Sequence, residues 1–83
     1  MRYCLRIEVS LKAGHSDPEG ETTSNTLKEL GYGVDAVRIG KVYNVVIEAG
    51  SQKEARSKAD EMCRRLLANP TKDDYAVTVE EMR

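Results

Sequence analysis

The amino-acid sequence predicts an α+β fold in which one antiparallel sheet of four strands carries two helices on one face. Three observations lead to this expectation: segments with apolar residues at every second position, two segments with helix-starting signals, and the order of these segments along the chain. A period of two is typical of a strand with one buried face, whereas a helix repeats its apolar residues three and four positions apart. The 83 residues have room for one domain, which we expect to span 1–83.

The first predicted strand covers residues 3–11, in which apolar side chains occupy the odd positions. Asp17 and Pro18 then start a helix, because an Asp side chain can accept hydrogen bonds from the free amides and Pro suits the first helical position. We expect this helix to run from Pro18 to about Leu30 and to end at Gly31. Its inner stripe would be Thr23, Thr26, Leu27 and Leu30. Since that stripe offers little apolar area, this helix should be the softest element.

Two further strands are expected at 34–39 and 42–49, joined by a hairpin. For the apolar residues of both strands to share one face, Ile39 must oppose Tyr43. This register leaves a loop of three residues, namely Gly40, Lys41 and Val42.

The second helix is predicted from Gln52 to about Leu67. Ser51 and Glu54 form a capping box in front of it, in which each side chain bonds an amide of the first turn. Its inner stripe contains Ala55, Ala59, Met62, Cys63, Leu66 and Leu67. Alternation over 75–79 predicts the last strand.

The predicted order, βαββαβ, is that of a ferredoxin-like two-layer sandwich. The sheet face away from the helices would carry Cys4, Arg6, Glu8, Arg38, Val46, Ala76 and Thr78. This set contains no aromatic side chain for base stacking, which argues against an RNA-recognition domain. Short apolar and charged groups together suit packing against another protein.

Composition excludes several classes of protein. Thirteen Lys and Arg face fourteen Asp and Glu, so the chain lacks the basic excess of a nucleic-acid-binding domain. No run approaches the ~20 apolar residues of a membrane span, and the N-terminal segment lacks the apolar core of a signal peptide. Cys4 and Cys63 form neither a CxxC motif nor a zinc spacing. We therefore expect a cytoplasmic protein with reduced thiols that binds neither nucleic acid nor membrane.

No catalytic constellation is predicted. The single histidine, His15, lies in a polar loop, and no triad or Cys/His pair can be built around it. The stretch "RIGK", residues 38–41, has one Gly and precedes a strand, so it is not a phosphate-binding loop of the Walker type. We expect no catalytic, cofactor-binding or metal-binding residues. Two interpretations of Arg38 and Lys41 stay open: a solvated hairpin tip, or a docking point for a partner.

Seven stretches together are specific: "LKAG", "DPEG", "LKELGYG", "VRIGK", "IEA", "EMCRRLLANP" and "DYAVTVEE". Over nearly the whole chain they resemble the PurS family, the small subunits of phosphoribosylformylglycinamidine synthase. The sequence departs from the family pattern at the threonines of the first helix and at His15-Ser16, so packing of that helix is expected to differ.

The resemblance implies a subunit, without an active site of its own, of an ATP-dependent glutamine amidotransferase complex (EC 6.3.5.3) in de novo purine synthesis. The complex makes formylglycinamidine ribonucleotide from formylglycinamide ribonucleotide, glutamine and ATP. A large subunit would use ATP and Mg, and a glutaminase subunit would release ammonia. This chain would bind no cofactor, would dock the glutaminase to the large subunit so that ammonia passes between them, and would form a dimer or a tetramer. The stretches "VRxGK" and "LANP" suggest as interface residues Arg38, Gly40, Lys41, Asn69 and Pro70.

Two other interpretations stay open. The first is a small-molecule-sensing regulatory domain of ferredoxin-like fold, which would bind its ligand at a dimer interface and be stabilised by it in a thermal shift assay. The second is a small phosphatase, although "KAGHSDPEG" does not match the glycine-rich, Arg-containing loop of acylphosphatases.

Overall fold

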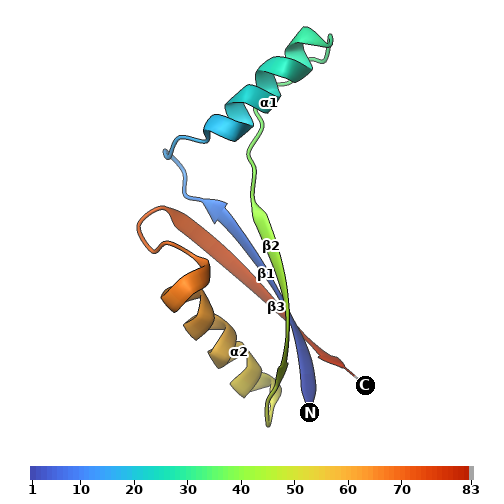
Figure 1. The fold of residues 1–83 in the computed structure, drawn as a ribbon, viewed down its shortest axis with the longest axis vertical. Coiled ribbons are helices and arrows are strands. Elements are labelled where there is room, and N and C mark those ends of the chain that lie inside the picture. The colour runs from blue at the N-terminus through green and yellow to red at the C-terminus, as the bar shows by residue number, and fades with distance from the viewer. Residues whose placement is uncertain (83) are drawn as a thin grey trace.

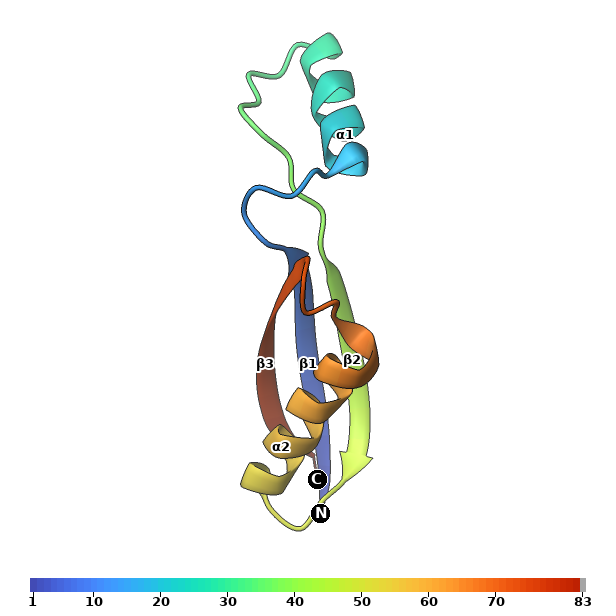
Figure 2. The ribbon, with the colours of Figure 1, turned by 90° about the vertical axis from the view of Figure 1, so that its left-hand side faces the viewer.

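The structure, a computed structural model, describes residues 1–82, which contain three strands, two α-helices and one π-helical turn. In chain order these are β1 (Arg2–Leu11), α1 (Pro18–Glu29), β2 (Lys41–Glu48), α2 (Gln52–Met62), the π-helical turn η1 (Cys63–Leu67) and β3 (Asp73–Met82) (Figure 1). The strands form one antiparallel sheet in the order β2-β1-β3, so β1 is central. α2 packs against β1 and β3 on one face (Figure 2). α1 stands beyond the end of the sheet as a separate arm (Figure 1).

The sheet has three strands where the sequence predicted four. Residues 34–40 form no strand but lead from α1 back to β2. The expected hairpin is therefore wrong, since Lys41 begins β2 opposite Val9 and Tyr43 pairs with Ile7 instead of Ile39. An alternating pattern favours extended backbone, but it does not say whether that backbone finds a strand to pair with.

The predicted apolar stripe of β1 is confirmed. Tyr3, Leu5, Ile7 and Val9 are buried, and Leu5 lies opposite Val45 on one side and Val79 on the other. The fully buried residues on the helical side of this core are small, namely Ala55, Ala59 and Cys63, while Met62 and Leu67 pack against it partly buried. Burial raises the pKa of the Cys63 thiol, which agrees with a packing role for this side chain.

The other face of the sheet is open, as expected. Pairing places Cys4 beside Val46, Arg6 beside Thr78 and Glu8 beside Ala76 on this face. Arg38, which was predicted to share this face, is absent from it because residues 34–40 lie outside the sheet.

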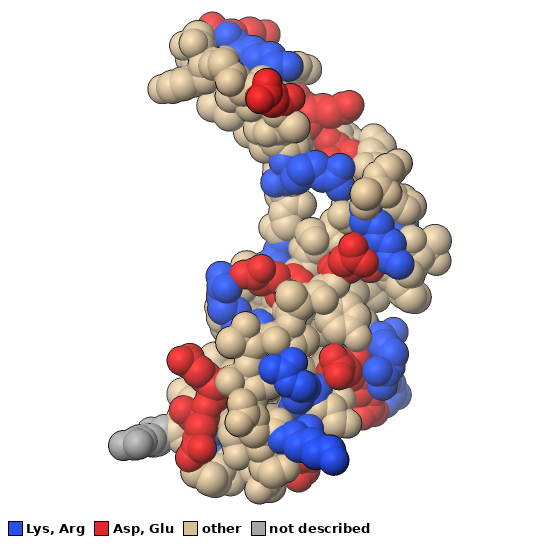
Figure 3. All heavy atoms as spheres, turned by 180° about the vertical axis from the view of Figure 1, so that it is seen from behind, with Lys and Arg blue, Asp and Glu red and all other residues tan. Residues whose placement is uncertain are grey.

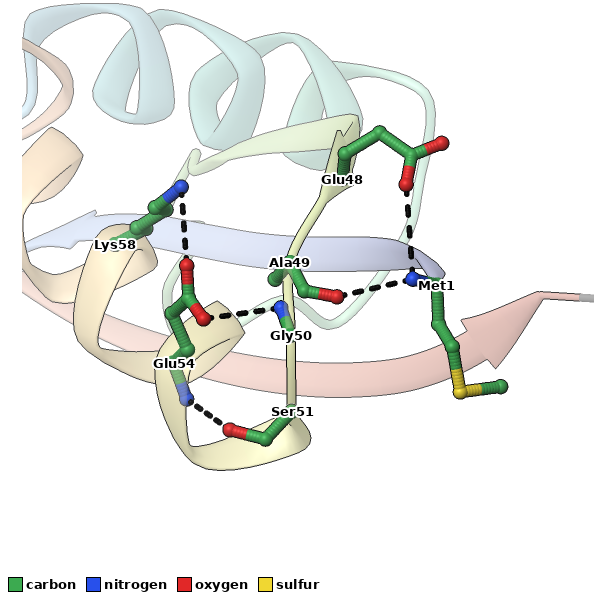
Figure 4. A network of polar contacts seen from close by, with 7 residues as sticks. All are labelled: Met1, Glu48, Ala49, Gly50, Ser51, Glu54 and Lys58. Atoms are coloured by element: carbon green, nitrogen blue, oxygen red, sulfur yellow. Dashed lines mark hydrogen bonds and ion pairs between the residues drawn. The ribbon is translucent and has the colours of Figure 1, made fainter.

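The connection from β2 to α2 is held by a cap (Figure 4). The Ser51 hydroxyl accepts a hydrogen bond from the Glu54 amide at 3.1 Å, as predicted. The Glu54 carboxylate reaches back to the amide of Gly50 at 2.9 Å and pairs with Lys58 at 3.4 Å. The bond from Gly50, followed by that of Lys58, lowers the pKa of Glu54. This cap fixes the first turn of α2 at the edge of the sheet.

The molecule is elongated for its length. Its principal extents are 51 × 29 × 14 Å, and its radius of gyration is 16.3 Å, whereas a compact chain of this size has a value of about 12 Å. The difference comes from α1, which does not fold back over the sheet (Figure 1). Among the described residues, no helix has the length and apolar character needed to cross a membrane.

Replacing the cap residue of α2 should destabilise the fold. We expect Ser51→Ala to lower the free energy of unfolding by about 1 kcal/mol, because it removes the acceptor for the Glu54 amide. Ser57→Ala is the matched control, since Ser57 is exposed within α2 and should tolerate Ala. Urea unfolding followed by circular dichroism measures both; equal midpoints for the two variants would contradict the proposed role of the cap.

Candidate functional site

Two of the stretches singled out in the sequence meet at one end of the sheet. Gly40 and Lys41, at the start of β2, and Asn69, after η1, line a common hollow of about 380 Å³. The base of the arm and the ends of β1 and β3 complete its wall, through Val9, Ser10, Leu11, Asp17, Glu19, Ile39, Leu67, Lys72 and Asp73. Of the five predicted interface residues, the structure thus brings three together, and Arg38 and Pro70 lie outside this lining.

Arg38 ties the two connections of the arm to each other. Its guanidinium donates hydrogen bonds to the backbone carbonyls of Leu11 and Lys12, at 3.2 and 3.4 Å. These carbonyls belong to the chain that leaves β1, while Arg38 belongs to the chain that returns to β2. The Arg38 side chain therefore stabilises the junction of the arm, unlike a side chain at a solvated hairpin tip. Its role in an interface stays a prediction.

Asp17 accepts one hydrogen bond that the sequence predicted and a second that it did not. Its carboxylate caps α1 by accepting from the Gly20 amide at 2.9 Å, as predicted, and it also accepts from the Ile39 amide at 2.8 Å. The Ile39 bond contributes most to lowering the pKa of Asp17, followed by the Gly20 bond and the charge of Arg38. The two bonded amides lie far apart in the sequence, so no local pattern could have revealed the second one.

Glycines allow the close contacts at this junction. A Cβ on Gly40 would lie 3.0 Å from the Val9 carbonyl oxygen, and a Cβ on Gly20 would collide with the Val37 carbonyl oxygen. Gly20 therefore lets the returning chain run against the first turn of α1. Because the backbone of another segment lies close to each position, glycine is favoured at Gly40, before β2, and at Gly20, in the first turn of α1.

Lys41 is exposed at the start of β2, and it makes no ion pair within residues 1–82. Because the Lys41 side chain lies beside the hollow and forms no ion pair within the described residues, its ammonium group can bind a carboxylate on another protein. Of the five predicted interface residues, Lys41 thus keeps its docking interpretation most fully.

Asn69 and Pro70 form the turn between η1 and β3. The Asn69 side-chain oxygen accepts from the amides of Thr71 and Lys72, and the Asn69 amide donates to the Asp73 carboxylate at 2.9 Å. This is the local turn that an Asn side chain commonly makes. Pro70 is exposed at its corner.

The hollow is lined by acidic and basic side chains, among them Asp17, Glu19, Lys41 and Lys72. Within residues 1–82, no three His, Cys, Asp or Glu side chains gather where they could hold a metal ion. Acidic and basic side chains intermingle over the side of the molecule drawn in Figure 3. A surface of mixed charge can bind a partner through neighbouring pairs of opposite charges, but it does not create a strong electrostatic field of one sign.

Comparison with known proteins agrees with the sequence motifs. The family model described as "PurS: Phosphoribosylformylglycinamidine (FGAM) synthase" matches residues 4–81. This chain belongs to the PurS family. PurS subunits of phosphoribosylformylglycinamidine synthase from Archaeoglobus fulgidus and Bacillus subtilis are 42% and 38% identical to it, over 76 and 81 residues. These alignments cover 90% and 96% of this chain and 95% of each relative.

Solved PurS structures share the same fold. Thermus thermophilus PurS matches with a TM-score of 0.88 and 39% identity, over 100% of both chains. A chain in the structure of PurLQS from Thermotoga maritima matches with a TM-score of 0.88 and 30% identity, over 96% of this chain and 99% of that one. The three-stranded sheet and the projecting arm are therefore compatible with the PurS fold along their whole length.

The close approach at Gly20 can be tested with two Gly→Ala variants. Gly20→Ala should reduce the stability of the arm by about 1–3 kcal/mol, because the added methyl group meets the Val37 carbonyl. Gly33→Ala is the control, since a Cβ there meets nothing within 4 Å. Amide hydrogen exchange across α1 measures the effect, and equal protection in both variants would rule out the close approach.

The Asp17 bond to Ile39 should depend on pH. Asp17→Asn keeps an acceptor for Gly20 but removes the charge and the second carboxylate oxygen, so the Ile39 amide should exchange faster in the variant at pH 7. Because the pKa of Asp17 is lowered below its ordinary 3.8 in the folded chain, the wild-type advantage is complete above that value and disappears as the pH falls through the lowered pKa. Asp35→Asn, on the exposed part of the arm, is the control. An advantage that is already lost at a pH above 3.8 would contradict this role, because the pKa of Asp17 lies below that value in the folded chain.

Proposed function

We propose that this chain is the non-catalytic small subunit of phosphoribosylformylglycinamidine synthase, and that it holds the glutaminase subunit against the large synthase subunit. The observation that carries the proposal is membership of the PurS family over residues 4–81. A chain in the structure of PurLQS from Thermotoga maritima has the same fold as this chain. This match also supports the proposal.

The chemistry of the complex would lie in the other subunits. Formylglycinamide ribonucleotide, ATP and Mg would bind the large subunit, and glutamine would be hydrolysed by the glutaminase. Ammonia escapes readily into water, so the two sites must stay aligned while it passes. A sheet with a projecting arm suits that task, because its two parts can contact two larger subunits at once. Such a complex would work in the cytoplasm.

We also propose that the chain associates with itself. A single copy has a small core and an arm that adds little burial, and small cores are only marginally stable. Large apolar side chains are also left exposed, including Leu30, Tyr32 and Leu66. Association of copies would remove this surface from water. The mass measured in solution distinguishes a dimer from a tetramer.

The ligand-sensing interpretation is less well supported. The PurS relatives match nearly the whole chain, and none of their names describes a sensor. Thermal shift against glutamine, ATP and purine nucleotides separates the two interpretations, because specific stabilisation by one small molecule alone would favour a sensor.

Reconstitution tests the proposed role. The large and glutaminase subunits should form the amidine from glutamine only when this chain is added, whereas the reaction supplied with ammonia should barely need it. Equal glutamine-dependent rates with and without the chain, in a mixture that can assemble, would refute the proposal.

Lys41 offers a sharper test of the docking surface than Arg38, which holds the arm. Lys41→Glu should weaken binding of this chain to the other two subunits at least tenfold, because it reverses an exposed charge beside the hollow. Lys53→Glu is the control, because Lys53 lies at the start of α2, which is at the other end of β2 from Lys41 (Figure 1). Titration of the glutamine-dependent rate with each variant gives the apparent affinity. Identical titrations for Lys41→Glu and wild type would remove Lys41 from the interface.

A further inference from the structure

The outer edge of β3 is a long strand edge without a neighbouring strand. The sheet order β2-β1-β3 puts β3 at one edge, and within residues 1–82 it pairs only with β1 (Figure 2). β3 has 10 residues, from Asp73 to Met82. An edge strand presents a row of unpaired amides and carbonyls to which a strand of another molecule can bind. Copies of this chain could therefore join through β3 into larger sheets.

Alternate residues of β3 point their backbone groups to this free edge. In an antiparallel ladder, residues bonded to the neighbouring strand alternate with residues whose amides and carbonyls point away from it. Lys12, just after β1, donates its amide to the Lys72 carbonyl at 2.7 Å, so even positions of β1 bond to even positions of β3. The amides and carbonyls of Tyr75, Val77 and Val79 therefore point outward.

The middle of β3 has the composition of a segment that binds other strands. Residues 75–79, "YAVTV", are aromatic, β-branched or small, and none is charged. Uncharged windows of about five to seven residues with high β propensity form intermolecular sheets readily. The outward backbone groups of β3 thus belong to the part of the strand that is most prone to pairing.

Arg56 of α2 covers the centre of this edge. Its guanidinium donates a hydrogen bond to the Val77 carbonyl oxygen at 3.2 Å. Val77 is the middle residue of the segment 75–79. The guanidinium nitrogen occupies the place of the amide that an incoming strand would supply, so such a strand must first displace a charged side chain.

Two acidic pairs flank the same segment. Asp73 and Asp74 precede it, Glu80 and Glu81 follow it, and β3 contains no basic residue. If two copies paired antiparallel with their 75–79 segments aligned, Asp74 would lie opposite Glu80, and Asp73 opposite Glu81. A parallel pairing in register would place each acidic residue opposite its own copy. Because like charges opposite each other on neighbouring strands are destabilising, both arrangements are disfavoured.

We propose that β3 is a guarded edge: Arg56 covers the Val77 carbonyl and the acidic pairs repel a second β3, so copies of this chain do not join through this strand. The guard matters for the self-association proposed above. A chain that associates through one surface would extend into open-ended assemblies if it also paired through a second one. The guarded edge lets association stop at a closed assembly.

Removing the guard should allow the copies to join through β3. The triple variant Arg56→Ala, Asp74→Asn, Glu80→Gln lacks the cover on Val77 and the charges that would face each other on the open face of the sheet. Sedimentation velocity at rising protein concentration should give masses above those of wild type. Pairing through β3 should be about tenfold tighter in the variant.

A control variant carries the same change in charge away from β3. It combines Arg64→Ala, Glu29→Gln and Asp35→Asn, all at exposed positions. Its masses should match those of wild type, and circular dichroism checks that each variant is folded. Equal masses for the triple variant and wild type at every concentration would overturn the inference, as would an equal gain of mass in the control.

Amide hydrogen exchange locates the contact. In wild type, the outward amides of Tyr75 and Val77 should exchange faster than those of Ala76 and Thr78, which bond to β1. In the triple variant at high concentration, the outward amides should become protected. Protection of these amides already in wild type would show that the edge is paired and overturn the inference. A larger mass of the triple variant without their protection would place the new contact elsewhere and overturn it as well.

Discussion

The central position of β1 is the constraint on which the rest of the structure depends. Both neighbouring strands pair with β1 alone, and within residues 1–82 its inward residues provide the only fully buried large aliphatic side chains, Leu5 and Ile7. A shift of one residue in either pairing would turn a neighbour's apolar side chains to the open face. α2 then has a single apolar surface to pack on, and the ends of β1 determine where the arm begins and where β2 must start.

The junction between the arm and the sheet shows how a few polar groups direct a whole element. Asp17 and Arg38 each bond to backbone on the opposite connection, and glycine allows the two chains to approach. The Arg38 bonds are exposed and the Asp17 bond to Ile39 is partly buried. Each contributes little by itself, yet each joins the chain that leaves the sheet to the chain that returns. Arg38, which the sequence suggested as a contact for a partner, thus holds the arm in place, and a mutation there disturbs the arm whatever else it does.

Much of the fold could be predicted from the sequence because it is encoded locally. The period of two in β1, the Asp17-Pro18 start of α1 and the Ser51 cap of α2 are short-range patterns with short-range causes. The fourth strand could not be judged in this way, since residues 34–39 alternate correctly but have no partner in the described chain. The site was predicted in part: the two motifs do meet at one hollow, but the second bond of Asp17 spans the arm and left no sequence signal.

The arm also changes the order in which the sheet can assemble. Val9 and Lys41 are paired neighbours in space, yet the whole arm lies between them in the chain. Closing a loop of about 30 residues instead of a tight turn of four costs about 2 kcal/mol more in chain entropy. The pairing of β1 with β2 is therefore delayed relative to what a hairpin would allow. The arm is thus an insertion between two adjacent strand ends. Such an insertion can lengthen, shorten or be replaced during evolution while the sheet keeps all of its strand pairs.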